Sequence, residues 1–450
     1  MLLVDLNKVM KRAVIFMVGL ASCLNTMQAQ NPIVPPGMYI ADPEAHVWND
    51  GKIYIYGSRD ESDDYWCSYT HHVLSSEDLI SWNIVENAFA SKGTNDQVAD
   101  HDKLLFAPDC GYKEGTYYLY YCSPGKPKTG GVATSTSPVG PFINGQPIKG
   151  VYGIDPAVFI DDDGQGYYFW GQVKPKLAKL KSNMTEIDES TIVEPLDQSQ
   201  GQVFHEGSSI RKIGGLYYLV FADESRDHRP TCLGYAISED PMGPYKYKGI
   251  IIDNMGSDPQ VWNNHGSIEK FNEQWYVFYH RPTNNSRKFR KACVEPITIN
   301  PDGTIDEVEM TTQGALGRAI VARGVMQAER ACFLSGSVYI SSLETTDVTN
   351  EGLVNISNGD YVAYKYLDFE KRIGTFKIKT SESKGGQVEL RIDDPKGKVI
   401  GNCEIAPSVD NNPYNITSCP VNEVKGEHAL YLIFKGEEKT LFNIDWFEFN

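Results

Sequence analysis

The chain has 450 residues, 41% of them hydrophobic, and a formal net charge of −17 at pH 7. This composition is that of a soluble globular protein with room for two or three domains. The negative charge argues against nucleic acid or an anionic membrane surface as a partner, because both require a basic protein face. Beyond the N-terminus, no apolar run reaches the ~18 residues of a bilayer-spanning helix, so we expect no transmembrane span.

Residues 1–29 are typical of a signal peptide, because basic residues precede an apolar stretch at 13–20 and small residues follow it. Cleavage near Ala29 would release a secreted or periplasmic protein, and we favour this route. The alternative is lipid attachment at Cys23, since Leu20-Ala21-Ser22-Cys23 resembles a bacterial lipobox. That route would give a lipid-anchored form on the outer membrane or cell surface. Both routes predict a location outside the cytoplasm.

A turn followed by an aromatic-rich strand recurs five times in the first two-thirds of the chain. The repeats are marked by Tyr54, Tyr118, Tyr168, Tyr218 and Tyr276, at steps of 64, 50, 50 and 58 residues. A period near 50 with one hairpin per unit is typical of a β-propeller. Further short strands with polar turns follow the hairpins, as expected for four-stranded blades. We therefore predict a five-bladed β-propeller over residues 34–311.

The pattern changes after the fifth repeat. Residues 312–326 form a glycine-containing linker, and residues 327–450 contain short alternating strands without the repeated hairpin. The predicted fold class is therefore all-β, a five-bladed propeller followed by a β-sandwich (jelly-roll) domain. Cys403 and Cys419 share this last domain and could form a disulfide in an oxidising compartment. Buried free thiols are an equal alternative, because spacing does not determine connectivity.

Four polar residues stand about a dozen positions before marker tyrosines: Asp42, Asp155, Glu206 and His265. The first strand of a propeller blade lies innermost, so residues at one phase of the repeat converge at one end of the central channel. Taken singly, the Asp-Pro steps could be turn starters, Glu206 a solvated strand end and His265 a structural histidine. Their common phase favours a shared site.

Carboxylates that lie close together in a partly dry site cannot all stay ionised, because desolvation and like charge raise the pKa of at least one. A neutral acid beside an ionised one is what glycoside hydrolysis requires. The run Asp161-Asp162-Asp163-Gly164 has the composition of a calcium loop. It falls where a hairpin turn is due, so we predict a turn there.

The chain resembles glycoside hydrolase family 43 over about residues 38–310. The matching phrases are Ala41-Asp42-Pro43-Glu44-Ala45-His46, Phe106-Ala107-Pro108-Asp109, Ile154-Asp155-Pro156-Ala157-Val158, Phe204-His205-Glu206-Gly207-Ser208 and His265-Gly266-Ser267. The resemblance implies a propeller that hydrolyses glycosidic bonds with inversion. Asp42 would be the general base, Glu206 the general acid, and Asp155 the carboxylate that raises the pKa of the acid and orients it. Inversion requires room for water, so Asp42 and Glu206 should lie about 6.5–9.5 Å apart.

The same resemblance implies further contacts at this site. His265 matches a channel histidine that contacts a central water or a calcium ion. Phe106 would form an aromatic wall of the −1 subsite. We expect Trp66, His46 and Arg281 to bind substrate as well. No cofactor is expected for the chemistry itself.

The C-terminal domain resembles carbohydrate-binding module family 6, from Gln327-Ala328-Glu329 to the last strand. Members that bind sugar clamp it between two aromatic side chains. Here one of those positions is Asn355 and the other is Tyr414, so sugar binding and a structural role both stay open. Glu329 and Asp445 match positions near that family's structural calcium.

These features favour an exo-acting α-L-arabinofuranosidase, expected to be monomeric, that acts on plant cell-wall polysaccharide or its oligosaccharides. A β-xylosidase, an endo-xylanase or a β-galactosidase of the same fold is the alternative within the class. A non-catalytic sugar-binding propeller is the alternative from another class. It predicts that a catalytic position is substituted, whereas Asp42, Asp155 and Glu206 are all present.

Overall fold

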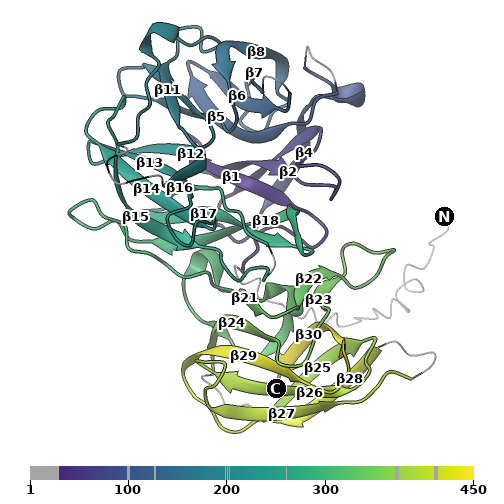
Figure 1. Cartoon of the computed structure of the whole chain (residues 1–450). Coiled ribbons are helices and arrows are strands. Elements are labelled where there is room, and N and C mark those ends of the chain that lie inside the picture. The colour runs from purple at the N-terminus through teal and green to yellow at the C-terminus, as the bar shows by residue number, and fades with distance from the viewer. Residues whose placement is uncertain are drawn as a thin grey trace, which may run out of the picture.

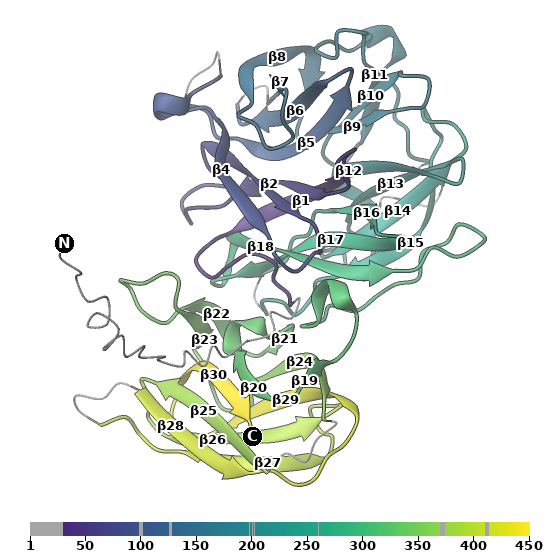
Figure 2. The same cartoon turned by 180° about the vertical axis from the view of Figure 1, so that it is seen from behind.

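The structure is a computed structural model that describes residues 30–98, 102–125, 128–197, 199, 201, 203–259, 261–369, 374–409 and 414–450. The expected signal peptide, with Cys23, lies outside these residues. The described chain is built almost entirely from strands. Figures 1 and 2 show the blades of the propeller above and the sandwich below. The predicted all-β fold class is therefore confirmed.

Each of the five blades begins with an antiparallel hairpin, as the repeats predict. Blade 1 contains β1 (Ile40–Val47), β2 (Ile53–Arg59), β3 (Thr70–Ser76) and β4 (Asn83–Ala90), and blade 2 contains β5 (Phe106–Lys113), β6 (Thr116–Ser123), β7 (Thr129–Ser135) and β8 (Ile143–Tyr152). Blade 3 contains β9 (Ala157–Ile160), β10 (Gly166–Trp170) and β11 (Lys176–Lys179). Blade 4 contains β12 (Phe204–Ile213), β13 (Leu216–Asp223), β14 (Cys232–Ser238) and β15 (Lys246–Asp253), and blade 5 contains β16 (Ser267–Phe271), β17 (Gln274–Thr283) and β18 (Ser286–Ile297).

Blades 3 and 5 differ from the expected four strands. In blade 3 the outer position is reduced to two isolated bridges, Leu177 with Val193 and Leu180 with Ile187. In blade 5 the N-terminal lead-in occupies the outer position, where Ile33 N donates to Ala292 O at 2.9 Å. β1 then pairs with β18 in parallel, and the strands of blades 5 and 1 form one seven-stranded sheet. The first and last blades are thus joined by hydrogen bonds.

The paired aromatics of each hairpin hold neighbouring blades together. Successive strand residues point to opposite faces, so Tyr217 packs into the core shared by blades 3 and 4, and Tyr218 into the core shared by blades 4 and 5. Similar cores lie between blades 1 and 2, 2 and 3, and 5 and 1. Tyr120, Tyr168 and Tyr218 are fully buried. Most of the tyrosine-rich composition therefore serves packing between blades.

The innermost strands carry irregularities where the predicted acids stand. The pairing of β1 with β2 shifts register between Ala41 and Glu44, and that of β12 with β13 shifts on both sides of Glu206. A bulge bends a strand and re-aims the side chain at its position. Asp42 has φ of 53° and Asp155, just before β9, has φ of 56°. Asp is among the few residues that tolerate this left-handed region.

The sandwich consists of two sheets that enclose one large core. One sheet has the order β19 (Ile320–Val321), β24 (Tyr361–Asp368), β29 (Glu427–Lys435), β26 (Gly386–Ile392) and β27 (Val399–Ile405), with β21 (Phe333–Ser335) on β24. The other has the order β22 (Tyr339–Ser342), β23 (Glu351–Val354), β30 (Asn443–Phe449), β25 (Thr375–Ser381) and β28 (Tyr414–Pro420), with β20 (Gly324–Gln327) on β30. The expected linker, 312–326, thus contributes β19 and part of β20 to this domain.

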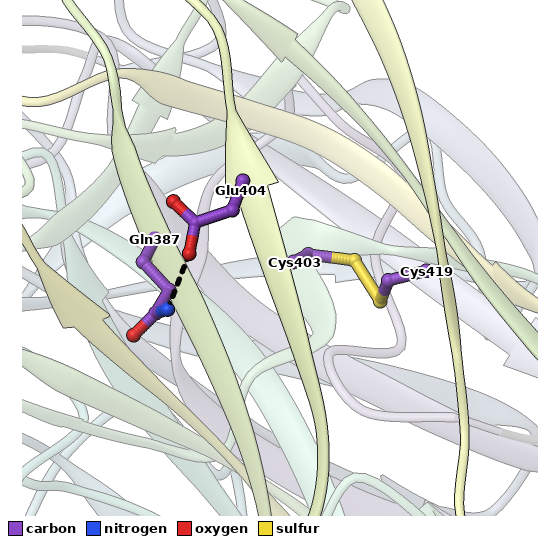
Figure 3. The surroundings of a disulfide bond; sticks show 4 residues. All are labelled: Gln387, Cys403, Glu404 and Cys419. Atoms are coloured by element: carbon purple, nitrogen blue, oxygen red, sulfur yellow. Dashed lines mark hydrogen bonds between the residues drawn. A yellow bond between two sulfur atoms is a disulfide. The ribbon is translucent and has the colours of Figure 1, made fainter.

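Cys403 and Cys419 form a disulfide between β27 of one sheet and β28 of the other, as Figure 3 shows. Of the two alternatives that the sequence left open, the structure shows the paired form. The remaining cysteines of the described chain are free and buried. Because Cys403 and Cys419 lie in different sheets, the bond fixes the edge of one sheet against the other.

Candidate active site

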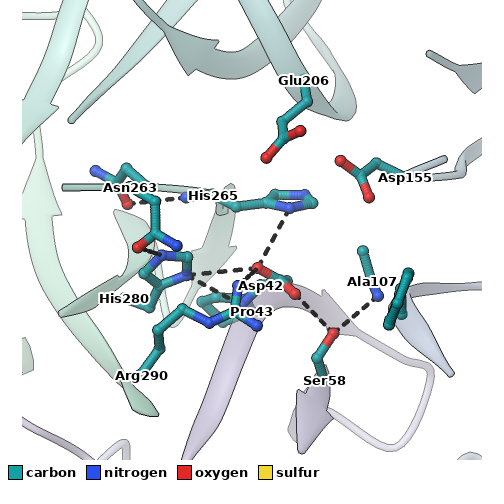
Figure 4. A network of polar contacts seen from close by, with 12 residues as sticks. Asp42, Pro43, Ser58, Ala107, Asp155, Glu206, Asn263, His265, His280 and Arg290 are labelled. Carbon is teal, nitrogen blue, oxygen red and sulfur yellow. Dashed lines mark hydrogen bonds and ion pairs between the residues drawn. The ribbon is translucent and has the colours of Figure 1, made fainter. Parts of the chain in front are cut away.

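Three blades bring the predicted acids to one place. Asp42 comes from the start of β1, Asp155 from the residue pair before β9, and Glu206 from the start of β12. Figure 4 shows their carboxyl groups pointing toward one another, with the ring of His265 between Asp42 and the other two. Asp42 and Asp155 are buried, whereas the side chain of Glu206 is 26% exposed. Glu206 is therefore the carboxyl group of the three that solvent reaches most easily.

Asp42 is held as a carboxylate by a dense set of partners. Arg290 Nη1 donates to its Oδ1 at 2.8 Å, and the hydroxyl of Ser58 donates to its Oδ2 at 2.6 Å. Ser58 also accepts from Ala107 N of blade 2. Burial alone would raise the pKa of Asp42, but the charge of Arg290, with His265, outweighs it and holds that pKa well below its usual range. This carboxylate can accept a proton from water without first losing one.

His280 supports the backbone of Asp42 as a neutral ring. Asp42 N donates to His280 Nδ1 at 3.2 Å, and His280 Nε2 lies 3.1 Å from Asn263 Oδ1. This pattern assigns the ring proton to Nε2. Burial and the nearby charge of Arg290 hold the pKa of His280 well below its ordinary value. The ring therefore fixes the position of Asp42 without adding charge.

His265 is a cationic spacer in this cluster. Its Nδ1 lies 3.5 Å from Asp42 Oδ1. Burial would lower its pKa, but the hydrogen bond and charge of Asp42, with the charges of Asp155 and Glu206, raise the pKa to about 9. A metal ligand must be a neutral imidazole. His265 thus suits the role of an imidazolium between Asp42 and the pair Asp155 and Glu206, and its expected contact with water or calcium stays a prediction.

Asp155 and Glu206 form a carboxyl pair. Burial raises the pKa of Asp155, and the charges of Glu206 and Asp42 raise it further, whereas His265 and Lys128 act in the opposite direction. Two neighbouring carboxyl groups in a partly dry site share protons and do not both ionise. The pair therefore retains a proton at neutral pH, which is the condition for acid catalysis.

Aromatic side chains lie beside this cluster. Trp66 is 38% exposed, and the guanidinium of Arg290 lies 5.0 Å from its ring centroid. Phe106 is half-buried at the start of β5, next to Ala107. Trp66 therefore stands one contact away from Asp42, through Arg290, and Phe106 is linked to Asp42 through its neighbour Ala107 and then Ser58. Aromatic faces next to a polar cluster suit the apolar face of a sugar ring.

His46 lies deeper than expected for substrate contact. It is four residues beyond Asp42 on β1, its Nε2 is 2.7 Å from Asp109 Oδ1, and its ring stacks on Trp48 at 4.9 Å. Burial is the main cause that lowers its pKa to about 4. His46 is therefore held in the wall of the channel by protein partners, and its contact with substrate stays a prediction.

The prediction that Arg281 binds substrate is wrong. This side chain is 3% exposed, and its guanidinium bonds to Tyr279, Thr311 and Glu295. Side chains alternate along β17, so once His280 faces Asp42 its neighbour Arg281 must face the other way. The arginine at the site is Arg290 of β18. In the sequence, only the position of Arg290 after the fifth hairpin indicated that this arginine could reach the site.

A second buried cluster lies along the channel, where Glu44, His46 and Asp109 could together hold a metal ion. Arg211 Nη2 already donates to Glu44 Oε1 at 2.9 Å. Burial, and for Glu44 the charge of Asp109, raises the pKa of both Glu44 and Asp109 to about 7. Arg211 supplies the positive charge that these carboxyl groups need, so the donor set fits a protein ion pair better than a cation site.

The two residues expected near a structural calcium in the sandwich do not form a shared ligand set. Asp445 Oδ2 accepts from Lys379 Nζ at 2.6 Å. Glu329 Oε2 is buried without a hydrogen-bond partner, and burial raises the pKa of Glu329 to about 7. Lys291 and Glu351 lie close enough to act electrostatically on Glu329. The nearby positive charges are basic side chains of the protein, Arg330 and Lys291 near Glu329 and Lys379 beside Asp445. The run from Asp161 to Gly164 forms the predicted turn, with Gly164 N donating to Asp161 O.

Comparison with known protein families gives two matches. The model of glycosyl hydrolases family 43 matches residues 29–305, and that of carbohydrate binding module family 6 matches residues 327–450. Together the matches cover both parts of the chain that the structure separates into propeller and sandwich.

Curated relatives match over most of the chain. A xylosidase/arabinosidase of Thermoclostridium stercorarium is 29% identical over 91% of this chain and 96% of its own length. An arabinoxylan arabinofuranohydrolase of Paenibacillus polymyxa is 28% identical over 91% of this chain and 72% of its own. A xylosidase/arabinosidase of Humicola insolens is 31% identical over 60% of this chain and 96% of its own.

Solved structures of similar fold agree. An arabinoxylan arabinofuranohydrolase from Bacillus subtilis, in complex with cellotetraose, has a TM-score of 0.53 and 24% identity and covers 94% of this chain and 99% of its own, a likeness that shows the fold. A β-xylosidase/α-arabinofuranosidase from a compost microbial metagenome, in complex with xylotriose, has a TM-score of 0.53 and 30% identity and covers 62% of this chain and 97% of its own.

Proposed function

The chain belongs to glycosyl hydrolases family 43 and is a glycosidase, and from this we propose that it is an inverting, exo-acting α-L-arabinofuranosidase. Its substrate would be arabinoxylan, or arabinose-bearing oligosaccharides released from plant cell walls. The proposal rests on one observation: Asp42, Asp155 and Glu206, from three different blades, point toward one another in one site. The three acids have different environments and therefore different tasks.

Asp42 is the general base. Its carboxylate stays ionised because Arg290 and Ser58 satisfy it, so it can take a proton from a water molecule that attacks the sugar. As the proton moves, Asp42 becomes neutral and the attraction of Arg290 weakens. Asp60, which also accepts from Arg290 Nε at 2.8 Å, keeps the guanidinium in place during this step.

Glu206 is the general acid. It is the most exposed of the three carboxyl groups and can reach the oxygen of the leaving group. Asp155 lies beside it, buried, and because the two carboxyl groups do not both ionise, the pair keeps a proton that can pass to the leaving group. His265 separates this pair from Asp42, so that the acid and the base can work on opposite faces of the sugar.

The substrate assignment rests on the relatives. Proteins named arabinoxylan arabinofuranohydrolase match 91% of this chain, propeller and sandwich together. A second candidate is β-xylosidase activity, because another relative of the same coverage is named xylosidase/arabinosidase. One catalytic site can serve both sugars if its rim accepts either ring.

Chromogenic glycosides test the assignment. We expect turnover of 4-nitrophenyl α-L-arabinofuranoside to exceed that of the β-D-xyloside and the β-D-galactoside. Glu206→Gln is the control for chemistry at this site, with a loss of about 10²–10⁴-fold on poor leaving groups. Exclusive turnover of the xyloside would replace the proposed substrate by the second candidate. Full activity of Glu206→Gln would exclude the proposed acid.

No cofactor is needed, because water and three carboxyl groups account for the hydrolysis. For the sandwich we propose that basic side chains, Arg330 among them, take the place of the expected structural calcium. Lys379 neutralises Asp445, and Lys291 of the propeller forms an ion pair with Glu351 at 2.7 Å. The buried carboxylates are thereby balanced by charges of the chain itself.

We propose a structural role for the sandwich. Asn355, at one clamp position, donates its amide to Ser337 O. Tyr414, at the other, has Lys379 Nζ 4.3 Å from its ring centroid and its hydroxyl bonded to Glu344. A clamp needs two open aromatic faces, and this cleft offers at most one.

We further propose export by the N-terminal segment and action as a monomer outside the cytoplasm, with lipid attachment at Cys23 as the alternative. None of the helices in the described part of the chain is long and apolar enough to cross a membrane. A polymeric plant substrate cannot enter a cell intact, which agrees with export. Mass spectrometry of the mature N-terminus distinguishes cleavage near Ala29 from a lipidated Cys23.

A further inference from the structure

The loop between β10 and β11 of blade 3, residues 171–175, is hydrogen-bonded to the residues that precede Asp155 in blade 3 and Glu206 in blade 4. Gly171 N donates to Ile154 O at 2.9 Å, and Val173 N donates to His205 O at 2.7 Å. Ile154 and His205 are the residues directly before the two acids. Through these two backbone hydrogen bonds, the 171–175 loop holds in place the residues that precede both acids.

This loop holds a conformation that its sequence does not favour. Val173 has φ of 66°, a left-handed value that a β-branched residue rarely adopts. Its side chain is 51% exposed, so burial of the side chain does not offset the cost. Gly171 has φ of 133°, and a Cβ there would come within 2.4 Å of Lys174 O. Strain of this kind is retained where the surrounding structure uses the position.

The contact made by this conformation is to the acid itself. Gln172, between the two anchored residues, donates from Nε2 to Glu206 Oε2 at 2.8 Å. His205 Nε2 lies 3.9 Å from the same oxygen, and its Nδ1 is 3.0 Å from Glu224 Oε2. Both polar neighbours therefore approach Oε2 of Glu206. Neither of these contacts involves the other oxygen, Oε1.

We propose that Gln172 is a positioning residue for the catalytic acid: its amide holds Glu206 Oε2 as an acceptor, so that the proton sits on Oε1 and points at the leaving group. The proposal rests on the assignment of Glu206 as the general acid. An amide cannot release its protons to a carboxylate, so Gln172 stays a donor throughout the catalytic cycle. The strained Val173 keeps this donor in reach.

The same geometry has a consequence for pH dependence. The titratable groups that face Glu206 are Asp155, His265 and His205, and Glu224 lies behind His205, in contact with its Nδ1. A hydrogen bond donated to a carboxylate favours its ionised form. Removal of the Gln172 amide removes this hydrogen bond, whereas the titratable groups around Glu206 stay in place. The acid then holds its proton to higher pH, and the alkaline limb of the pH profile moves upward.

The test compares Gln172→Met with the native enzyme on two aryl glycosides of the sugar that it hydrolyses. A phenyl leaving group needs proton donation, and a 2,4-dinitrophenyl group does not. We expect kcat on the phenyl glycoside to fall by about 10- to 100-fold, the dinitrophenyl glycoside to change by less than about twofold, and the alkaline limb of kcat/KM to shift upward. Gln172→Glu, with a like charge beside the acid, should shift that limb further.

Gln165→Met is the matched control, because Gln165 makes the same kind of side-chain amide bonds in blade 3, to Gly166 O and Leu180 O, away from the acids. It should leave both substrates and the pH profile unchanged. An equal loss on both substrates in Gln172→Met, or an unmoved alkaline limb, overturns the proposal. Glu206→Gln distinguishes the proposed function from the role of Gln172. If Glu206→Gln also loses activity equally on both glycosides, the proposed function fails. If Glu206→Gln shows the dependence on the leaving group and Gln172→Met does not, only the role of Gln172 fails.

Discussion

At the scale of single residues, the convergence of the acids could be predicted because it depends on phase. Asp42, Asp155 and Glu206 recur at one position of a repeat, and any propeller brings such positions together. The partners of Asp42 could not be predicted in this way. His280 and Arg290 reach it from blade 5, more than 230 residues away in the chain. Which side of a strand they face depends on the register of β17 and β18.

Arg290 and Arg281 make a matched pair for testing this account. Both are buried arginines of blade 5, and only Arg290 touches Asp42. In Arg290→Gln the charge that lowers the pKa of Asp42 is lost, so that pKa rises and the base becomes protonated at higher pH. We expect the acid limb of kcat/KM to move upward by about 1–3 pH units.

Arg281→Gln should lower the melting temperature and leave the acid limb in place. Arg290→Lys retains a charge without the planar fork that spans Asp42 and Asp60, and should give an intermediate shift. An acid limb that is the same in the native enzyme, Arg290→Lys and Arg290→Gln would refute the assignment of Asp42 as the titrating base.

At the scale of elements, the hairpins are readable from the sequence because turn residues and paired aromatics recur. The bulges at Asp42 and Glu206 cannot be predicted from the sequence. A strand that simply alternates would not point both the acid and the core residues in the directions that the structure shows, so the bulge depends on the tertiary fold. The missing outer strand of blade 3 also escapes prediction. Residues 187–193 pair through two isolated bridges only, and this pairing depends on the neighbouring strand and not on local propensity.

The disulfide is an element-scale device whose removal has a predictable effect. Cys403 and Cys419 are 16 residues apart and join strands of different sheets. By constraining the unfolded chain, a loop of this size stabilises by about 3 kcal/mol. We expect Cys403→Ser/Cys419→Ser to lose about that much free energy of unfolding in urea titrations.

A thiol reductant should shift the native protein to the same midpoint and leave the double variant unchanged, because the other cysteines of the described chain are free. Glycosidase activity at low temperature should persist, since the bond is remote from the propeller. Equal unfolding midpoints with and without the bond would contradict a stabilising role.

At the scale of the whole molecule, the two domains share a buried polar interface. Lys291, 2% exposed on β18, reaches Glu351 of the sandwich, which also accepts from Tyr39 OH and Gly37 N. Asn284 N donates to Ile340 O across the same interface. The sequence predicted both domains but no contact between them, because nothing in a local pattern records which surfaces meet.

The interdomain ion pair predicts how the molecule responds to mutation and to metal removal. Lys291→Met leaves Glu351 buried without its cation and should lower the free energy of unfolding by about 3 kcal/mol. The double variant Lys291→Met/Glu351→Gln should recover part of this loss, because no uncompensated charge remains. Calorimetry of the native protein should give one melting temperature with or without a calcium chelator. A clear fall on chelation would show that calcium, and not lysine, balances these carboxylates.

The proposed hydrolysis requires an acid and a base on opposite faces of the sugar, with a water molecule between the base and the sugar. Proton NMR of the first sugar released from an arabinofuranosyl oligosaccharide tests this most directly. Attack by water opposite the leaving group predicts that an α-L-arabinofuranoside first yields the β anomer, before mutarotation. First release of the α anomer would mean that a carboxylate, and not water, attacks the sugar, and would contradict the roles assigned to Asp42 and Glu206.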